Sequence, residues 1–78
     1  MKYLFSNKDF LTGDTVTFKL YKIDGAFEEE KIGTEIGSLG IYSADFSLSP
    51  SDEYILIAES ELQEWRDFKY ITFGRGGN

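Results

Sequence analysis

Apolar and polar residues alternate along much of this 78-residue chain, and a period of two is typical of β-strands with one buried face. The alternation is clearest over residues 15–23, where Val16, Phe18 and Leu20 share one side. The dipeptide Asp24-Gly25 comes next, and Asp-Gly is a strong signal for a tight hairpin because both positions tolerate positive φ. We therefore expect a strand here and a second strand that returns beside it.

The returning strand is predicted over residues 27–36, with Ile32, Thr34 and Ile36 on one face. Gly33 interrupts this predicted strand, because it has no side chain. A glycine inside a strand marks a bulge or a close approach of another group.

Four more segments have strand character. Residues 2–6, 41–48 and 68–73 alternate or are rich in aromatic and β-branched residues. Residues 54–58 are apolar on both faces, which predicts a central strand that is covered on both sides. The turn sequence at 49–52, with Pro50 in its second position, separates two of these strands.

Residues 60–67 allow two interpretations. Ser60-Glu61-Leu62-Gln63 fits a capping box, and Leu62 with Trp65 could form one face of a short helix. The alternative is a long polar connection held in place by Trp65. We expect residues 1–73 to form a single domain and the glycine-rich residues 74–78 to form a flexible tail.

About six short strands with a turn signal every 8 to 15 residues predict an all-β fold, either an antiparallel β-sandwich or a small barrel. A parallel sheet is excluded because no connection is long enough for a crossover helix. The short helix near residues 60–67 is the one helical element that the sequence allows.

The segment GIYSADFSL at residues 40–48, followed by EYILIA at 53–58, resembles one hairpin of small prealbumin-like and immunoglobulin-like β-sandwiches. It is also similar to accessory structural proteins of bacteriophage particles. The resemblance covers roughly residues 13 to 58. It implies a structural or assembly role, as one copy among many. The antibody-type domains are not implied, because the chain lacks their cysteine pair.

The amino-acid composition excludes most kinds of catalytic site. The chain has no His and no Cys, so the commonest general base, the commonest metal ligand and the thiol nucleophile are all absent. Six to eight oxygens would have to converge to hold Ca²⁺, and the acidic residues do not follow a loop motif that does so. We expect no enzyme activity, no catalytic residues, no cofactor and no metal site.

Charge narrows the choice of partner. With 8 basic and 14 acidic residues the net charge is −6, which opposes binding to phosphate backbones and to anionic membranes. The expected partners are proteins, either a second copy or another component of an assembly, and neither nucleic acid nor membrane is expected. No apolar run suits a membrane span or a secretion signal. We expect cytoplasmic synthesis, with a virion as the location that the phage resemblance implies.

Five residues are candidates for an interaction site. Tyr21 and Ile23 are apolar on the otherwise polar face of their strand, which indicates either a second packed layer or an exposed interaction patch. Trp65, Arg66 and Phe68 are close together near the C-terminus, and Trp and Arg are enriched at binding hot spots. Packing of Trp65 against the bottom of the core is the alternative for that residue.

The sequence therefore favours a non-catalytic structural or protein-interaction module within a larger assembly. One alternative is an acidic inhibitor that imitates DNA, which needs rows of carboxylates from the run 28–30 and from Glu59, Glu61 and Glu64 on one side. Another is a carbohydrate-binding module with an exposed planar row that includes Trp65.

Overall fold

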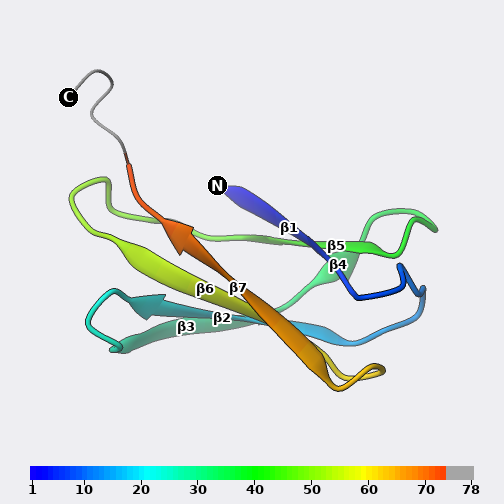
Figure 1. The fold of residues 1–78 in the computed structure, drawn as a ribbon. Coiled ribbons are helices and arrows are strands. Elements are labelled where there is room, and N and C mark those ends of the chain that lie inside the picture. The colour runs from blue at the N-terminus through cyan, green and yellow to red at the C-terminus, as the bar shows by residue number, and fades with distance from the viewer. Residues whose placement is uncertain (74–78) are drawn as a thin grey trace.

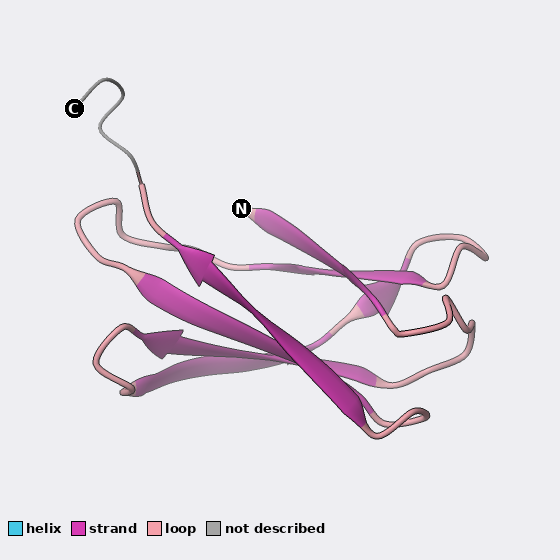
Figure 2. Ribbon diagram, in the orientation of Figure 1, coloured by secondary structure: helices cyan, strands magenta, loops and turns pink. Residues whose placement is uncertain are grey.

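The computed structural model describes residues 1–73 of the chain, and all regular structure in this range is β (Figures 1 and 2). The predicted all-β class is therefore confirmed. The strands are β1 (Lys2–Ser6), β2 (Val16–Lys22), β3 (Phe27–Ile32), β4 (Thr34–Glu35), β5 (Ile41–Asp45), β6 (Tyr54–Ser60) and β7 (Trp65–Ile71).

The strands form two antiparallel sheets, of which one has the order β1-β5-β4 and the other β3-β2-β6-β7. In Figure 1 the two sheets lie as separate layers that face one another. No strand ladder connects the two sheets within residues 1–73, so the fold is a sandwich and the predicted alternative of a small barrel is wrong.

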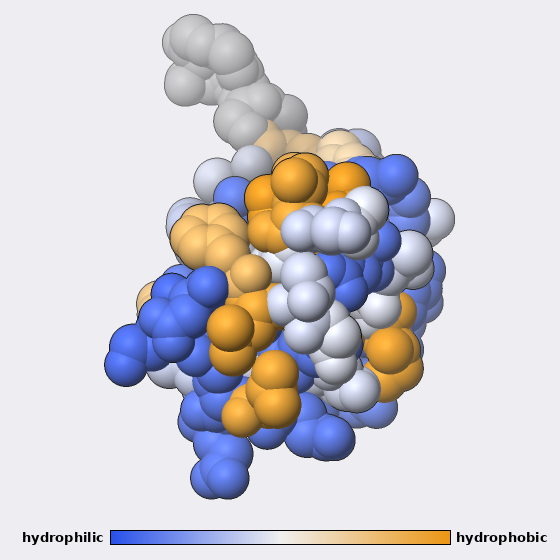
Figure 3. All heavy atoms as spheres, turned by 90° about the vertical axis from the view of Figure 1, so that its right-hand side faces the viewer, coloured by the Kyte–Doolittle hydropathy of each residue, from blue (hydrophilic) through white to orange (hydrophobic). Residues whose placement is uncertain are grey.

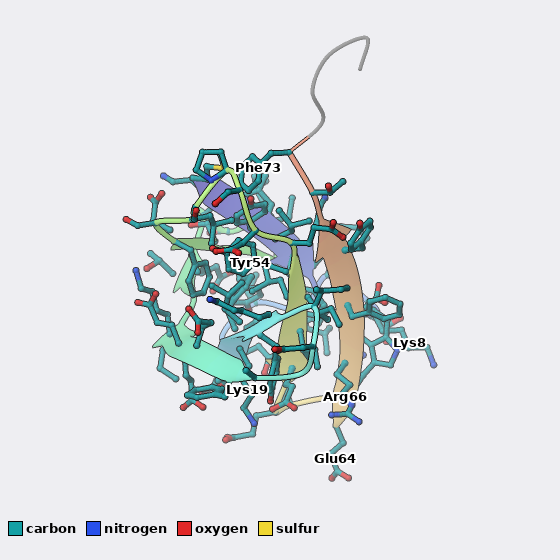
Figure 4. All side chains as sticks on the ribbon, turned by 90° about the vertical axis from the view of Figure 1, so that its left-hand side faces the viewer. Lys8, Lys19, Tyr54, Glu64, Arg66 and Phe73 are labelled. Atoms are coloured by element: carbon teal, nitrogen blue, oxygen red, sulfur yellow. The ribbon has the colours of Figure 1, made fainter. Side chains whose placement is uncertain are left out.

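The core lies between the layers and comes from the inward sides of β2, β5, β6 and β7 and from Phe46, whereas the inward positions of β3 hold Glu29 and Lys31. Val16, Phe18 and Leu20 of β2 are almost completely buried, and Tyr54 of β6 lies inside with them (Figure 4). The remaining buried apolar residues are Tyr42, Ala44, Phe46, Leu56, Ala58 and Ile71. The predicted inner faces of β2, β5 and β6 are therefore confirmed.

The hairpin between β2 and β3 closes at the predicted dipeptide. Gly25 has φ of +93°, a conformation that costs glycine little, and its N–H donates to the Lys22 carbonyl at 2.8 Å. The Asp24 carboxylate accepts from the Ala26 N–H at 2.9 Å. The turn predicted at residues 49–52 also forms, since the Asp52 N–H donates to the Ser49 carbonyl at 3.1 Å.

Residues 60–67 contain no helix, so the helical interpretation is wrong. Residues 61–64 form a turn and Trp65 already begins β7, three residues before the predicted start of the last strand. The Ser60 hydroxyl does accept the Gln63 N–H, as a capping residue would, but it stabilises a turn. A segment this short cannot be helical by itself, and pairing of β7 along β6 stabilises the extended form.

The predicted strand over 27–36 is in fact two strands in different sheets. β3 ends at Ile32, and after Gly33 the chain enters β4 in the other sheet. An added Cβ on Gly33 would lie 2.6 Å from Cε1 of Phe18, which confirms the predicted close approach. The expected face of Ile32, Thr34 and Ile36 is exposed, because the switch of sheets turns it outward.

β6 is central, as predicted, since β2 and β7 pair with its two edges. Only one of its faces is covered. Ile55 and Ile57 lie on the side turned away from the other sheet, where residues 1–73 provide no further layer, and both side chains are half-buried. The expectation that this strand is covered on both sides is therefore wrong for the single chain.

Among residues 1–73 there is no helix of the length and apolar character needed to cross a membrane. The predicted tail, residues 74–78, lies outside the described residues.

Gly33→Ala is expected to lower the free energy of unfolding by about 1–3 kcal/mol, because the new methyl group overlaps the Phe18 ring. Chemical denaturation measures this effect. Repeating Gly33→Ala in a Phe18→Leu background is the control, and the substitution should then cost less because the ring is gone. An equal cost in both backgrounds would show that the overlap is not the cause.

Candidate functional site

The outer face of the four-stranded sheet is the most unusual surface of the described residues. The register aligns its outward side chains in rows across the sheet. One row runs Glu30, Lys19, Ile57 and Phe68, and the next runs Phe27, Tyr21, Ile55 and Tyr70. Apolar side chains therefore cover the second row and the β6 and β7 positions of the first, where an antiparallel sheet normally presents polar ones.

Three of these six apolar side chains are more than half exposed, with Phe68 at 68% and Tyr70 at 51%, whereas Tyr21, Ile55 and Ile57 are half-buried. We call the following seven residues the apolar face: Tyr21, Ile23, Phe27, Ile55, Ile57, Phe68 and Tyr70. Ile32 is also exposed but lies apart from them, beside Thr17 and Glu30. With about 150–250 Å² for each aromatic side chain, the exposed part of the apolar face is on the order of 600 Å², the upper end of what typical monomers show.

The other sheet provides an internal comparison. Its outward positions on β1, β5 and β4 are mainly polar, and Leu4 and Ile41 are the apolar residues among them. The polar members are Lys2, Ser6, Thr34, Ser43 and Asp45. The two outer surfaces of the sandwich therefore differ, and a general tolerance for exposed apolar residues does not explain the apolar face.

Charged groups lie at the rim of the apolar face and are paired with one another. Glu59 lies between the Lys19 ammonium at 3.2 Å and the Arg66 guanidinium at 3.6 Å (Figure 4 labels both basic residues). The hydrogen bond and the charge of Glu59 raise the pKa of Lys19 above its usual value. At the opposite end of β6, the Tyr70 hydroxyl donates to the Glu53 carboxylate, and this bond raises the pKa of Tyr70.

The structure brings four of the five predicted site residues to this surface. Tyr21 and Phe68 lie within the apolar face, Ile23 follows directly after β2, and Arg66 is at the rim. Trp65 is not among them. It faces the space between the sheets and stacks on Phe5, with ring centroids 5.6 Å apart and ring planes at 27°.

Sequence reasoning missed the other members, which are Phe27, Ile55, Ile57 and Tyr70. The signal was present in the apolar outer positions of 54–58 and in the alternation of 68–73, which places Phe68 and Tyr70 together. The side-by-side order of β2, β6 and β7, which collects these residues on one surface, is a property of the folded chain alone.

The free edges of the same sheet carry charges. On β7, Asp67 and Lys69 occupy inward-facing positions yet are exposed, and they lie at a hollow that opens towards Phe5 and Phe18. On β3, the inward-facing Lys31 forms an ion pair with Glu29 at 3.5 Å. Inward charges on edge strands hinder pairing with further strands. Docking at the face is thereby favoured over docking at the edge.

A polar cluster at one end of the sandwich could in principle be a reactive site. The Asp14 carboxylate accepts hydrogen bonds from Ser60 Oγ, from Asn7 Nδ2 at 3.0 Å and from the Leu62 N–H at 2.9 Å. Tyr42 also contacts this loop, because its hydroxyl donates to the Leu11 carbonyl at 2.8 Å and accepts from the Asp14 N–H. Every group in the cluster bonds to another, which fits a role in fixing the loop.

Burial by itself raises the pKa of the Asp14 carboxyl. The hydrogen bonds from Ser60, Asn7 and the amides of Leu62 and Thr15 together outweigh burial and hold the pKa below its usual value. Asp14 is therefore a stable carboxylate at neutral pH and is a poor general base.

The cluster holds together the loops at the end of the molecule that Figure 3 shows. Hydrophobic side chains there form separate groups divided by hydrophilic ones (Figure 3). The exposed members at these loops are Phe10, Leu11, Ile36, Leu39 and Leu62, which come from three different loops.

The acidic residues do not gather in one row. The run 28–30 lies in β3 near the β2–β3 hairpin, whereas Glu61 and Glu64 lie in the turn at the opposite end of β6. Glu59 is paired with two basic residues. Within residues 1–73, no three acidic side chains are grouped so that they could hold a metal ion.

No family model matches the sequence, and the comparisons with curated proteins and with solved structures return no match. The function is therefore inferred from the apolar face and the polar cluster described above.

Asp14→Ala is expected to lower the free energy of unfolding at pH 7 by about 1–3 kcal/mol, since three donors lose their acceptor. Because the folded-state pKa is lowered, this stabilisation is present above the unfolded-state value of about 4 and is lost as pH falls through the folded-state value. Denaturation curves from pH 7 to pH 3 should show the difference between wild type and variant shrinking.

The control is Glu61→Ala, which removes an exposed carboxylate from the neighbouring turn. It should change stability little at any of these pH values. A difference between wild type and Asp14→Ala that stays constant down to pH 3 would contradict the assigned role of the carboxylate.

Proposed function

We propose that this protein is a non-catalytic interaction module that binds a protein partner through the apolar face, as a component of a larger assembly. The single observation that carries the proposal is the exposed apolar surface across β3, β2, β6 and β7. A surface of this size rimmed by charged residues is typical of a protein–protein contact.

The composition of the face supports a protein as the ligand. Aromatic residues are enriched at interface centres because they provide large contact areas, and the apolar face contributes Tyr21, Phe27, Phe68 and Tyr70. The rim pairs Lys19 and Arg66 with Glu59, an arrangement that suits the polar border of an interface.

The resemblance to accessory proteins of phage particles adds a setting to the proposal, in which many copies contribute to one particle. The two alternatives receive less support. An inhibitor that imitates DNA needs its carboxylates in rows, and these lie at opposite ends of the sheet. A carbohydrate-binding module needs an exposed planar row that includes Trp65, and Phe5 covers one face of that ring.

Two substitutions of similarly exposed residues at separate places on the molecule test this proposal. Phe68→Ser alters the apolar face, and Leu39→Ser, at a position 59% exposed, alters the turn between β4 and β5. Size-exclusion chromatography with light scattering, on the pure protein and on the protein mixed with extract of its source cells, should show association. Phe68→Ser should abolish it and Leu39→Ser should retain it.

Both variants should unfold at close to the wild-type denaturant concentration, because exposed positions contribute little to stability. A chain that remains monomeric in both settings and retains no partner would refute the proposed function.

A further inference from the structure

The apolar face has the features of a surface that pairs with itself. We propose that its partner is a second copy of this chain, packed sheet on sheet into a dimer. This inference rests on the proposed function, because it names the occupant of the same face.

The distribution of charge favours a second copy as the partner. The chain has a net charge of −6, so a binding surface for a basic partner would be strongly acidic. The rim of the apolar face instead holds two basic side chains and three acidic ones, which are Lys19, Arg66, Glu30, Glu53 and Glu59. Most of the negative charge thus lies elsewhere, and two copies meet at this face with little repulsion.

The shape of the face also favours a second copy. Phe68 is well exposed on β7, and a shallow hollow beside it, between β6 and β7, is lined by Ile55, Ile57, Arg66, Asp67 and Phe68 itself. In a two-fold contact each copy presents the same patch to the other. An exposed ring beside a hollow is self-complementary in such a contact, because each Phe68 can fill the hollow of the partner copy.

The area of the exposed surface is large enough for a stable dimer interface. The exposed apolar surface, on the order of 600 Å², together with the charged rim reaches the roughly 800 Å² per partner that stable interfaces bury. Covering it would also place a layer over Ile55 and Ile57, the two positions whose sequence predicts burial on both sides of β6.

Edge pairing is the competing way to join two sheets, and charge disfavours it here. Asp67 and Lys69 on β7, and Glu29 and Lys31 on β3, would have to enter a continuous core if either edge acquired another strand. The face is therefore the surface on which two copies meet.

Sedimentation equilibrium of the pure protein should show a concentration-dependent mass that approaches twice the 8.9 kDa of the chain. Phe68→Ser should raise the dissociation constant by about tenfold or more, as expected for a central aromatic residue. Leu39→Ser should leave it unchanged. A strictly monomeric wild type at all concentrations would overturn the dimer.

The absence of native cysteine permits a second measurement. Ile57→Cys places one thiol at the centre of the apolar face, and Ile41→Cys, at an equally half-buried outward position of the other sheet, is the matched control. Under mild oxidation at equal concentration, Ile57→Cys should form disulfide-linked dimers faster. Equal rates would overturn face-to-face pairing.

The two proposals fail differently. If the pure protein is monomeric but binds a different protein in a manner that Phe68→Ser abolishes, the second-copy inference is wrong and the proposed function stands. If Phe68→Ser alters neither self-association nor capture of another protein, both are wrong.

Discussion

The packing of the Phe18 ring between the two sheets is the interaction on which the rest of the structure depends. Phe18 belongs to β2, which is paired with β3 and β6, and its ring meets Phe5 edge to face at 6.3 Å. The same ring approaches Gly33, where the chain leaves one sheet and enters the other. Because the chain has no cysteine, no disulfide holds this small domain together, and this fit between ring and backbone joins the layers.

The ends of the strands need a different kind of stabilisation, because loops bring backbone N–H and C=O groups near the core. Asn7 and Tyr42 provide it by bonding to the backbone of the loop that connects β1 to β2, and the Asp14 carboxylate of that loop accepts from the Leu62 N–H in the turn between β6 and β7. Asn7 and Ser60 are buried, and each has hydrogen-bond partners there. The polar residues most deeply placed in the molecule thus serve the loop, which leaves the exposed apolar surface as the feature that calls for a function.

The apolar face consists of apolar residues like those of the core, but it lies on the outer side of the sheet. On β6, the inward residues Leu56 and Ala58 pack against the other sheet, while Ile55 and Ile57 on the reverse side have neighbours on β2 and β7 but no covering layer. Exposure of these apolar groups to water is unfavourable, as exposure of core residues is in the unfolded chain. A protein layer over the apolar face would remove that cost, and the charges on the edge strands would disfavour binding at the edges.

The alternation of residue types alone determined the all-β class, the inner faces of β2, β5 and β6, and the turns at Asp24-Gly25 and Ser49–Asp52. These features depend on neighbours within a few residues, so the local pattern contains them. The switch of sheet at Gly33, the extended form of Trp65–Asp67 and the gathering of Tyr21, Ile55 and Phe68 were decided by tertiary structure. Each depends on which strands lie side by side, and that order is set by contacts between residues far apart in the chain.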